Sequence, residues 1–190
     1  MDRTWLTAAK KLEFNDPKPF LANLRRFEQS VAVSDTPDRI KNLRTNGLKS
    51  WREARDAALF CYGMSQRIGQ TVYFAPAESQ DYDFVASWIV GHEQHLTPVQ
   101  LKEVVPKHLN PNASLEGVLA SLAKYVDSSE LTVAVKLNQQ GRFQPGELVP
   151  PQLNISALWV FAATTPDQSE WTLWGNFLEQ PESTAFRYPA

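Results

Sequence analysis

Three residues near the middle of the chain have the types needed for metal-assisted hydrolysis. Asp83 begins one apolar run, and Gln100 and Lys102 lie two residues apart in the next. The Asp83 carboxylate, the Gln100 amide oxygen and the backbone carbonyl of Leu101 form an all-oxygen ligand set, which suits Mg²⁺ or Mn²⁺. A lysine beside such a set can orient or deprotonate a water, or stabilise charge on a phosphate. The chemistry indicated is hydrolysis of a phosphodiester.

The same residues also have a non-catalytic interpretation. Asp83 could end a hairpin, with Gln100 and Lys102 on a solvated strand face. Two nearby acids, Glu78 and Asp81, are typical of turns, although either could supply a second carboxylate. The two interpretations make different demands on geometry, because only catalysis requires the three side chains to meet in an open cleft.

Other candidate chemistry finds less support in the sequence. The stretch GHEQH (residues 91–95) has two histidines and a glutamate but no cysteine and no evident further zinc ligand. We interpret these residues as the polar part of a hairpin. The chain has no nucleophile motif of a serine or cysteine hydrolase and no glycine-rich phosphate loop. The single Cys61 lies in an apolar helical stretch and is expected to be a buried thiol. Trp159, Trp171 and Trp174 are expected mainly in the core or on the sheet surface, although one or two could stack on bases.

The hydrophobic pattern predicts strands around the three candidate residues. Three short runs are rich in β-branched and aromatic residues, namely Gln70–Ala77, Tyr82–Val90 and Leu96–Val105. The connections between them are short enough for antiparallel hairpins. Alternation places Gln100 and Lys102 on one face of the third strand. Pairing of the second and third strands would bring Asp83 to that face.

Helical periodicity predicts the elements that flank these strands. Four stretches are expected to contain helices: Pro19–Val33, Thr36–Arg44, Ser50–Gly69 and Asn110–Val126. In the third of these, Ser50 is expected to cap the helix, Glu53 to complete a capping box, and Gly69 to end it.

The rest of the chain predicts a fourth strand at Glu130–Asn138, a Pro- and Gly-containing loop, and a hairpin formed by ISALWVFAATT and EWTLWGNFL. The expected fold is α/β (α+β), with a mixed central β-sheet flanked by helices. We expect a single domain over residues 1–190. It would comprise an N-terminal helical extension (1–49), a core (50–138), and a loop with a C-terminal β-hairpin (139–190).

The predicted core resembles the PD-(D/E)XK nuclease superfamily, which has the restriction-endonuclease-like fold. The order helix, three antiparallel strands, helix, strand is that of the family, whose aspartate begins the second strand and whose (D/E)XK triplet lies on the third. Asp83 matches the aspartate and QLK (residues 100–102) matches the triplet, with Gln in place of the acid as in some members. Tyr82 stands where the family has Pro.

The resemblance implies a metal-dependent nuclease. Asp83, Gln100 and the Leu101 carbonyl would hold Mg²⁺ or Mn²⁺, and Lys102 would position the water. A glutamate of the first core helix often assists the metal in this family, and Glu53 takes that place here. The catalytic set implied is therefore Asp83, Gln100, Lys102 and Glu53.

Charge and composition limit the classes of partner that the protein is expected to bind. The chain is 43% hydrophobic and 21% charged, which is ordinary for a globular protein. Residues 1–55 hold 12 basic and 7 acidic side chains, whereas residues 56–190 hold 7 and 14. The basic quarter could guide a nucleic acid, with DNA favoured over RNA, or form a solvated helical face. The alternative to an enzyme is a protein-interaction module, with a protein partner or a homodimer. The charged start and the lack of long apolar runs predict a cytoplasmic protein without membrane contact.

Overall fold

The computed structural model describes residues 4–32, 48–77, 79–126 and 128–190. The N-terminal half contains α1 (Thr4–Ala9), α2 (Pro17–Ala32), α4 (Lys49–Ile68), β1 (Tyr73–Pro76), β2 (Phe84–Val90) and β3 (Glu93–Val104). The C-terminal half contains α5 (Leu115–Ser121), β4 (Ser128–Leu137), β5 (Ile155–Ala163), β6 (Glu170–Gly175) and β7 (Glu182–Arg187), with short 3₁₀ turns at Leu122–Lys124 and Pro145–Glu147. The helix predicted at Thr36–Arg44 lies outside the described residues.

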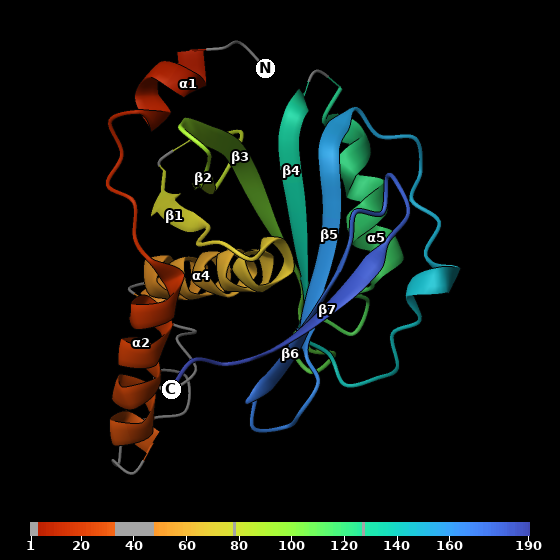
Figure 1. Ribbon diagram of the computed structural model, residues 1–190. Coiled ribbons are helices and arrows are strands. Elements are labelled where there is room, and N and C mark those ends of the chain that lie inside the picture. Colours follow the sequence, from red (N-terminus) through yellow and green to blue (C-terminus); the bar gives the residue numbers. More distant parts are fainter. Residues whose placement is uncertain (1–3, 33–47, 78, 127) are drawn as a thin grey trace.

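The strands form one curled, mixed seven-stranded sheet in which the spatial order follows the chain, β1 to β7 (Figure 1). β3, β4 and β5 run parallel to one another, and the other neighbouring pairs are antiparallel. β3 is long because it has two neighbours in turn. Its first part pairs with β2 and its second with β4, and only Val99 pairs with both. The candidate residues Gln100 and Lys102 follow this change of neighbour.

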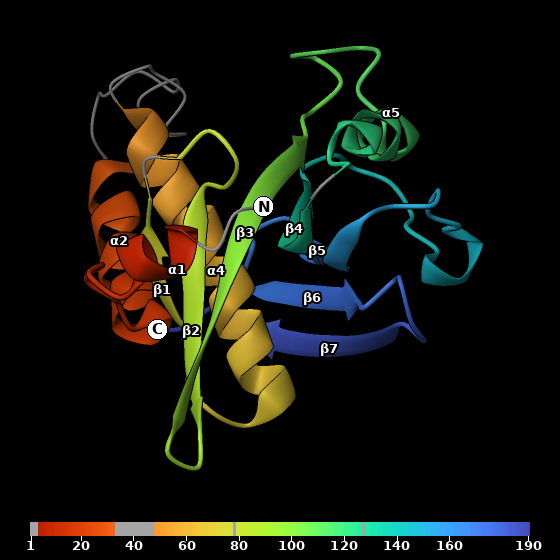
Figure 2. The same cartoon turned by 90° about the horizontal axis from the view of Figure 1, so that it is seen from above.

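The two faces of the sheet have separate hydrophobic cores. α4 packs on one face, against a cluster that includes Phe84, Phe161 and Trp171. α5 covers the other face, where Leu119 packs with a cluster that includes Val133. Figures 1 and 2 show these helices on opposite sides of the strands. Strand alternation explains the division, because successive side chains point to opposite faces.

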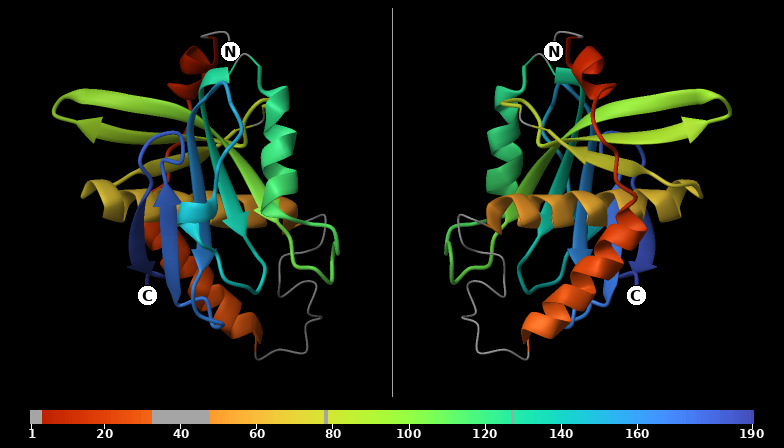
Figure 3. Two further views of the ribbon diagram at one scale, coloured as in Figure 1. Left: turned by 90° about the vertical axis from the view of Figure 1, so that its right-hand side faces the viewer. Right: turned by 90° about the vertical axis from the view of Figure 1, so that its left-hand side faces the viewer.

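The β2–β3 hairpin extends beyond the body of the molecule (Figure 3). Its turn is tight, since β2 ends at Val90 and β3 begins at Glu93. Gly91 has φ 61°, a left-handed conformation that glycine adopts without a steric penalty. The third strand therefore starts three residues earlier than the pattern predicts, and most of GHEQH belongs to the strand.

The predicted ends of α4 are half correct. Gly69 ends the helix in a left-handed conformation, as expected. The predicted cap at Ser50 and capping box at Glu53 are wrong, because the helix begins one residue before Ser50, after Leu48, and has no side-chain cap. Glu53 instead forms an ion pair with Lys49 one turn back, at 3.4 Å. That i, i+4 pair lies on the exposed side of the helix.

The predicted antiparallel pairing of the second and third strands is confirmed, with Phe84 opposite Val99. The C-terminal hairpin is confirmed as β5 and β6, with Phe161 opposite Leu173. The predicted helix before β4 is shorter than expected, ending at Ser121 and continuing as a 3₁₀ turn. β7 was not predicted. Its sequence, ESTAFR, mixes polar residues with a single buried Phe186, as suits an edge strand.

Candidate functional site

Asp83, Gln100 and Lys102 line one cleft, which has a volume of about 550 Å³. The cleft opens on the α5 face of the sheet. It lies where β2 begins and where β3 changes its pairing partner from β2 to β4. Its other lining residues are mostly polar or charged: Ser79, Gln80, Asp81, Lys124, Tyr125, Val126 and Ser128. The structure thus brings together the three side chains that were predicted to meet.

Asp83 lies just before the first residue of β2 and extends the pairing of β2 with β3 by one residue. Its backbone N–H donates to the Val99 carbonyl at 2.9 Å, which adds one hydrogen bond to the β2–β3 ladder. Two residues further along β3, the Asp83 side chain replaces a neighbouring strand as the hydrogen-bond acceptor, because its Oδ2 accepts the backbone N–H of Leu101 at 2.6 Å. The carboxylate therefore satisfies a donor that has no strand beside it, and it is fixed at the cleft by that bond.

Two oxygens of the proposed ligand set point to one position. The Gln100 amide nitrogen donates both to Asp83 Oδ2 and to the Leu101 carbonyl, the latter at 3.3 Å. A donor shared by a carboxylate and a carbonyl oxygen occupies the place that a cation between these oxygens would take. The Gln100 amide oxygen accepts a hydrogen bond from the Tyr125 hydroxyl at 3.2 Å. The donor set is thus suited to a hard cation, provided that the amide turns its oxygen inward.

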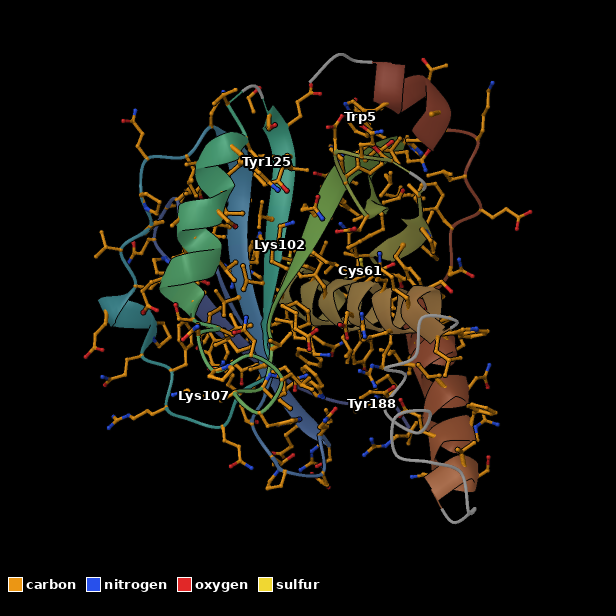
Figure 4. All side chains as sticks on the ribbon, turned by 180° about the vertical axis from the view of Figure 1, so that it is seen from behind. Trp5, Cys61, Lys102, Lys107, Tyr125 and Tyr188 are labelled. Carbon is orange, nitrogen blue, oxygen red and sulfur yellow. The ribbon has the colours of Figure 1, made fainter. Side chains whose placement is uncertain are left out.

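Lys102 shares the cleft with a second lysine and an aromatic ring. Its ammonium lies 5.8 Å from the centre of the Tyr125 ring, and that of Lys124 lies 5.2 Å from the same centre. Figure 4 shows Lys102 and Tyr125 on the side of the sheet covered by α5. Burial lowers the pKa of Lys102, and the nearby Asp83 carboxylate opposes that shift. The ammonium is therefore easier to deprotonate than that of a solvated lysine.

Burial raises the pKa of the Asp83 carboxyl, although the Leu101 N–H and Lys102 act in the opposite direction. The negative charge of Glu53 adds to the rise. Glu53 is therefore close enough to act electrostatically on the site, but it does not line the cleft and pairs instead with Lys49. Glu53 therefore lies outside the cleft and acts on it only through its charge.

The remaining candidates take other places. Within the described residues, no three His, Cys, Asp or Glu side chains are arranged to hold a metal ion. His95 stacks on Trp88, with ring centres 5.3 Å apart, along the hairpin. Asp81 lines the cleft, whereas Glu78 lies outside the described residues. Cys61 is fully buried, Trp159 and Trp171 are buried, and Trp174 is partly buried.

Lys124 and Tyr125 are among the cleft residues that sequence reasoning missed. Both follow the end of α5 in the stretch AKYV, which the pattern assigned to the helix. The helix ends early, and the 3₁₀ turn that follows brings the Tyr125 hydroxyl to Gln100. A polar aromatic residue beside a lysine at the end of a helix was the available signal.

No protein-family model matches this chain, and neither does any curated protein or solved structure. In the part of the chain that the structure describes, no helix has the length and apolar character to cross a bilayer.

Proposed function

We propose that the chain is a metal-dependent nuclease of the PD-(D/E)XK, restriction-endonuclease-like kind, hydrolysing phosphodiester bonds of nucleic acid. One observation carries the proposal: Asp83, Gln100 and Lys102 come from the start of β2 and the same face of β3 and line a single cleft. The order of elements from α4 to β4, a helix, three strands, a helix and a strand, also supports it.

Each residue has a role that follows from its contacts. Asp83 and the Leu101 carbonyl supply oxygens that are held in place by the sheet. When bound, Mg²⁺ or Mn²⁺ would neutralise phosphate oxygens and acidify a water. Lys102, with its lowered pKa, orients that water and stabilises charge that develops on the phosphate. Glu53 adds a negative charge at longer range.

Gln100 needs a change of orientation to serve as a ligand, and Tyr125 is placed to accommodate it. A phenol hydroxyl both donates and accepts hydrogen bonds. It can therefore donate to the amide oxygen, as it does here, or accept from the amide nitrogen after a half-turn of the amide. Tyr125 thus keeps Gln100 hydrogen-bonded in both orientations, so that the turn does not leave a polar group without a partner.

A second candidate is a non-catalytic interaction module, and one observation favours it. The Asp83 carboxylate completes the hydrogen bonding of β3 by accepting the Leu101 N–H. A carboxylate that completes the hydrogen bonding of a strand is useful to the fold even in a protein without catalytic activity. The two candidates differ in whether the cleft binds a divalent cation and a phosphodiester.

The test is hydrolysis of labelled single- and double-stranded DNA and RNA with Mg²⁺, with Mn²⁺ and with EDTA. We expect cleavage that requires the divalent cation and is lost in Asp83→Asn, which keeps an oxygen to accept the Leu101 N–H but removes the charge. Arg187→Ala serves as a matched control, because this exposed arginine lies on β7, away from the cleft. If the folded parent cleaves none of the four substrates with either cation, the interaction module replaces the nuclease.

A further inference from the structure

We infer that a second polar site, at the carboxyl ends of β3, β4 and β5, binds the phosphate backbone of a nucleic-acid strand that passes the cleft. This inference rests on the proposed function, because it names where the substrate lies beyond the reacting phosphate. The contacts with the nucleic-acid backbone are thereby assigned to the α5 side of the molecule. They are not assigned to the basic N-terminal quarter, residues 1–55.

The site consists of two adjoining cavities, together called the carboxyl-end groove. Their volumes are about 630 and 400 Å³. They share four lining residues: Lys107, Leu137, Gln139 and Gln140. The larger cavity reaches Ala163, the last residue of β5, and the smaller reaches Val104, the last residue of β3. The carboxyl ends of parallel strands are where the connecting loops of α/β proteins build ligand sites.

The groove offers cations and amides to a ligand. Lys107 and Arg142 carry positive charge, His108 lies next to Lys107 in the larger cavity, and Glu116 is the single acid in the linings. None of the three basic residues makes an ion pair or hydrogen bond with the described residues. The side-chain amides of Asn112, Gln140 and Gln168 also line the groove, whereas those of Asn138 and Gln139 donate within the protein. Cations together with neutral donors suit a phosphate backbone.

The floor of the groove is held in place by the protein itself. The Gln139 amide donates to the Val105 carbonyl at 2.7 Å and to the Ala113 carbonyl at 3.0 Å, so it ties the loop after β3 to the loop after β4. By contrast, two arginines of the N-terminal quarter are occupied within the molecule. Arg25 donates to the Asp167 carbonyl at 2.7 Å, and Arg55 pairs with Glu28 at 3.1 Å.

The groove and the cleft lie at opposite ends of α5, on the same face of the sheet. Gln100, Lys102 and Val104 alternate along that face of β3; the first two line the cleft and the third lines the groove. Figure 4 shows Tyr125, Lys102 and Lys107 in this order from top to bottom. The helical residues between the two sites span about 16 Å. A strand of a few nucleotides can therefore contact both.

The experiment measures binding of fluorescein-labelled 12-nucleotide single-stranded DNA and RNA by anisotropy in EDTA, over a range of salt concentrations. The test variant is Lys107→Ala/Arg142→Ala. Its matched control is Lys18→Ala/Arg187→Ala, which removes two exposed cations from α2 and β7. We expect the test variant to bind about tenfold more weakly and its salt slope to fall by about 1.4. The control should stay close to the parent.

Hydrolysis of bis(p-nitrophenyl) phosphate, which is too small to reach the groove from the cleft, separates this inference from the proposed function. A test variant that hydrolyses this ester like the parent but binds the oligonucleotides more weakly supports both. If the ester is not hydrolysed and binding still falls, the groove stands and the nuclease fails. Parent-like binding and salt slope in the test variant overturn the groove, and so does a parent that binds neither oligonucleotide.

Discussion

The two faces of the sheet each bring a lysine to an aspartate, with opposite outcomes. On the α4 face, Lys136 of β4 donates to Asp56 at 2.7 Å, and both residues are buried, with 3% and 7% of their surface exposed. On the α5 face, Lys102 of β3 lies near Asp83 in an open cleft. The register explains the division, because Lys102 pairs with Val135 and the next residue of β4 is Lys136.

The difference shows how enclosure separates a structural ion pair from a site available for chemistry. The Lys136–Asp56 pair is enclosed between α4 and the sheet, and Arg55 lies beside it with its Nε 3.6 Å from Asp56. These charges are shielded from solvent and are balanced by other groups of the protein. In the cleft, the cations and the carboxylate face solvent, and a substrate can take part in their interactions.

The largest expected effect is on the enclosed pair. Asp56→Ala leaves the buried Lys136 ammonium without its closest partner, so we expect a loss of about 3–5 kcal/mol in the free energy of unfolding. Urea denaturation measures it. Replacing both charges in Asp56→Leu/Lys136→Met should cost less than the single change, because no buried charge remains unpaired. A loss below about 1 kcal/mol for Asp56→Ala would end the contrast between the two faces.

The next effect concerns the open lysine. Lys102→Ala is expected to lower the rate of phosphodiester hydrolysis by at least about 100-fold, the scale of losing one group that stabilises charge. Its free energy of unfolding should change by less than about 1 kcal/mol, since the side chain is only partly buried. Parallel rate and urea measurements check both. A variant that unfolds easily but hydrolyses at the parent rate would assign Lys102 to the structure.

A smaller effect is expected at Tyr125. Tyr125→Phe keeps the ring beside the two lysines but removes the hydroxyl that bonds Gln100. We expect the free energy of unfolding to fall by about 1 kcal/mol, the contribution of one hydrogen bond, and the Mg²⁺ affinity to stay near that of the parent, because the hydroxyl bonds Gln100 in both of its orientations. Urea denaturation measures the stability and isothermal titration the affinity. A roughly fivefold or larger loss of affinity would mean that Tyr125 bonds Gln100 only in the orientation that binds the cation.

The smallest expected effect is a pH dependence of stability. Burial raises the pKa of Asp83 in the folded state. The protonated carboxyl therefore favours folding, and this contribution is lost as the pH rises from the unfolded pKa, about 3.9, through the folded pKa. Compared with Asp83→Asn, which does not titrate, the parent should lose stability across that window. Urea denaturation from pH 3.5 to pH 8 tests this, and a relative gain with rising pH would contradict it.

The strands and the meeting of the candidate residues were predictable because both depend on local pattern. Alternation and short connections determined the pairing of β2 with β3, and with it the approach of Asp83 to Gln100. The start of α4 was not predictable from capping rules, since the sequence offers Ser50 but the helix begins one residue before it. An N-cap residue contributes only about 1 kcal/mol, so it does not by itself fix where a helix begins.

The rest of the site depends on contacts between distant parts of the chain. Tyr125 enters the cleft only because α5 gives way to a 3₁₀ turn, which places it against a residue 25 positions earlier. The carboxyl-end groove arises from three parallel strands whose ends meet in space. The Lys136–Asp56 pair joins residues 80 positions apart. Hydrophobic periodicity carries no information about such pairings.

The central claim is that Asp83, Gln100 and Leu101 hold a divalent cation, and isothermal titration of Mg²⁺ and Mn²⁺ tests it directly. The parent should bind, and Asp83→Asn should lose binding, because it removes the one charge among the three ligands. Gln100→Glu adds a second carboxylate, so its affinity should exceed that of the parent. If the folded parent binds neither cation and Gln100→Glu creates no binding, the cleft is only a polar face of the sheet.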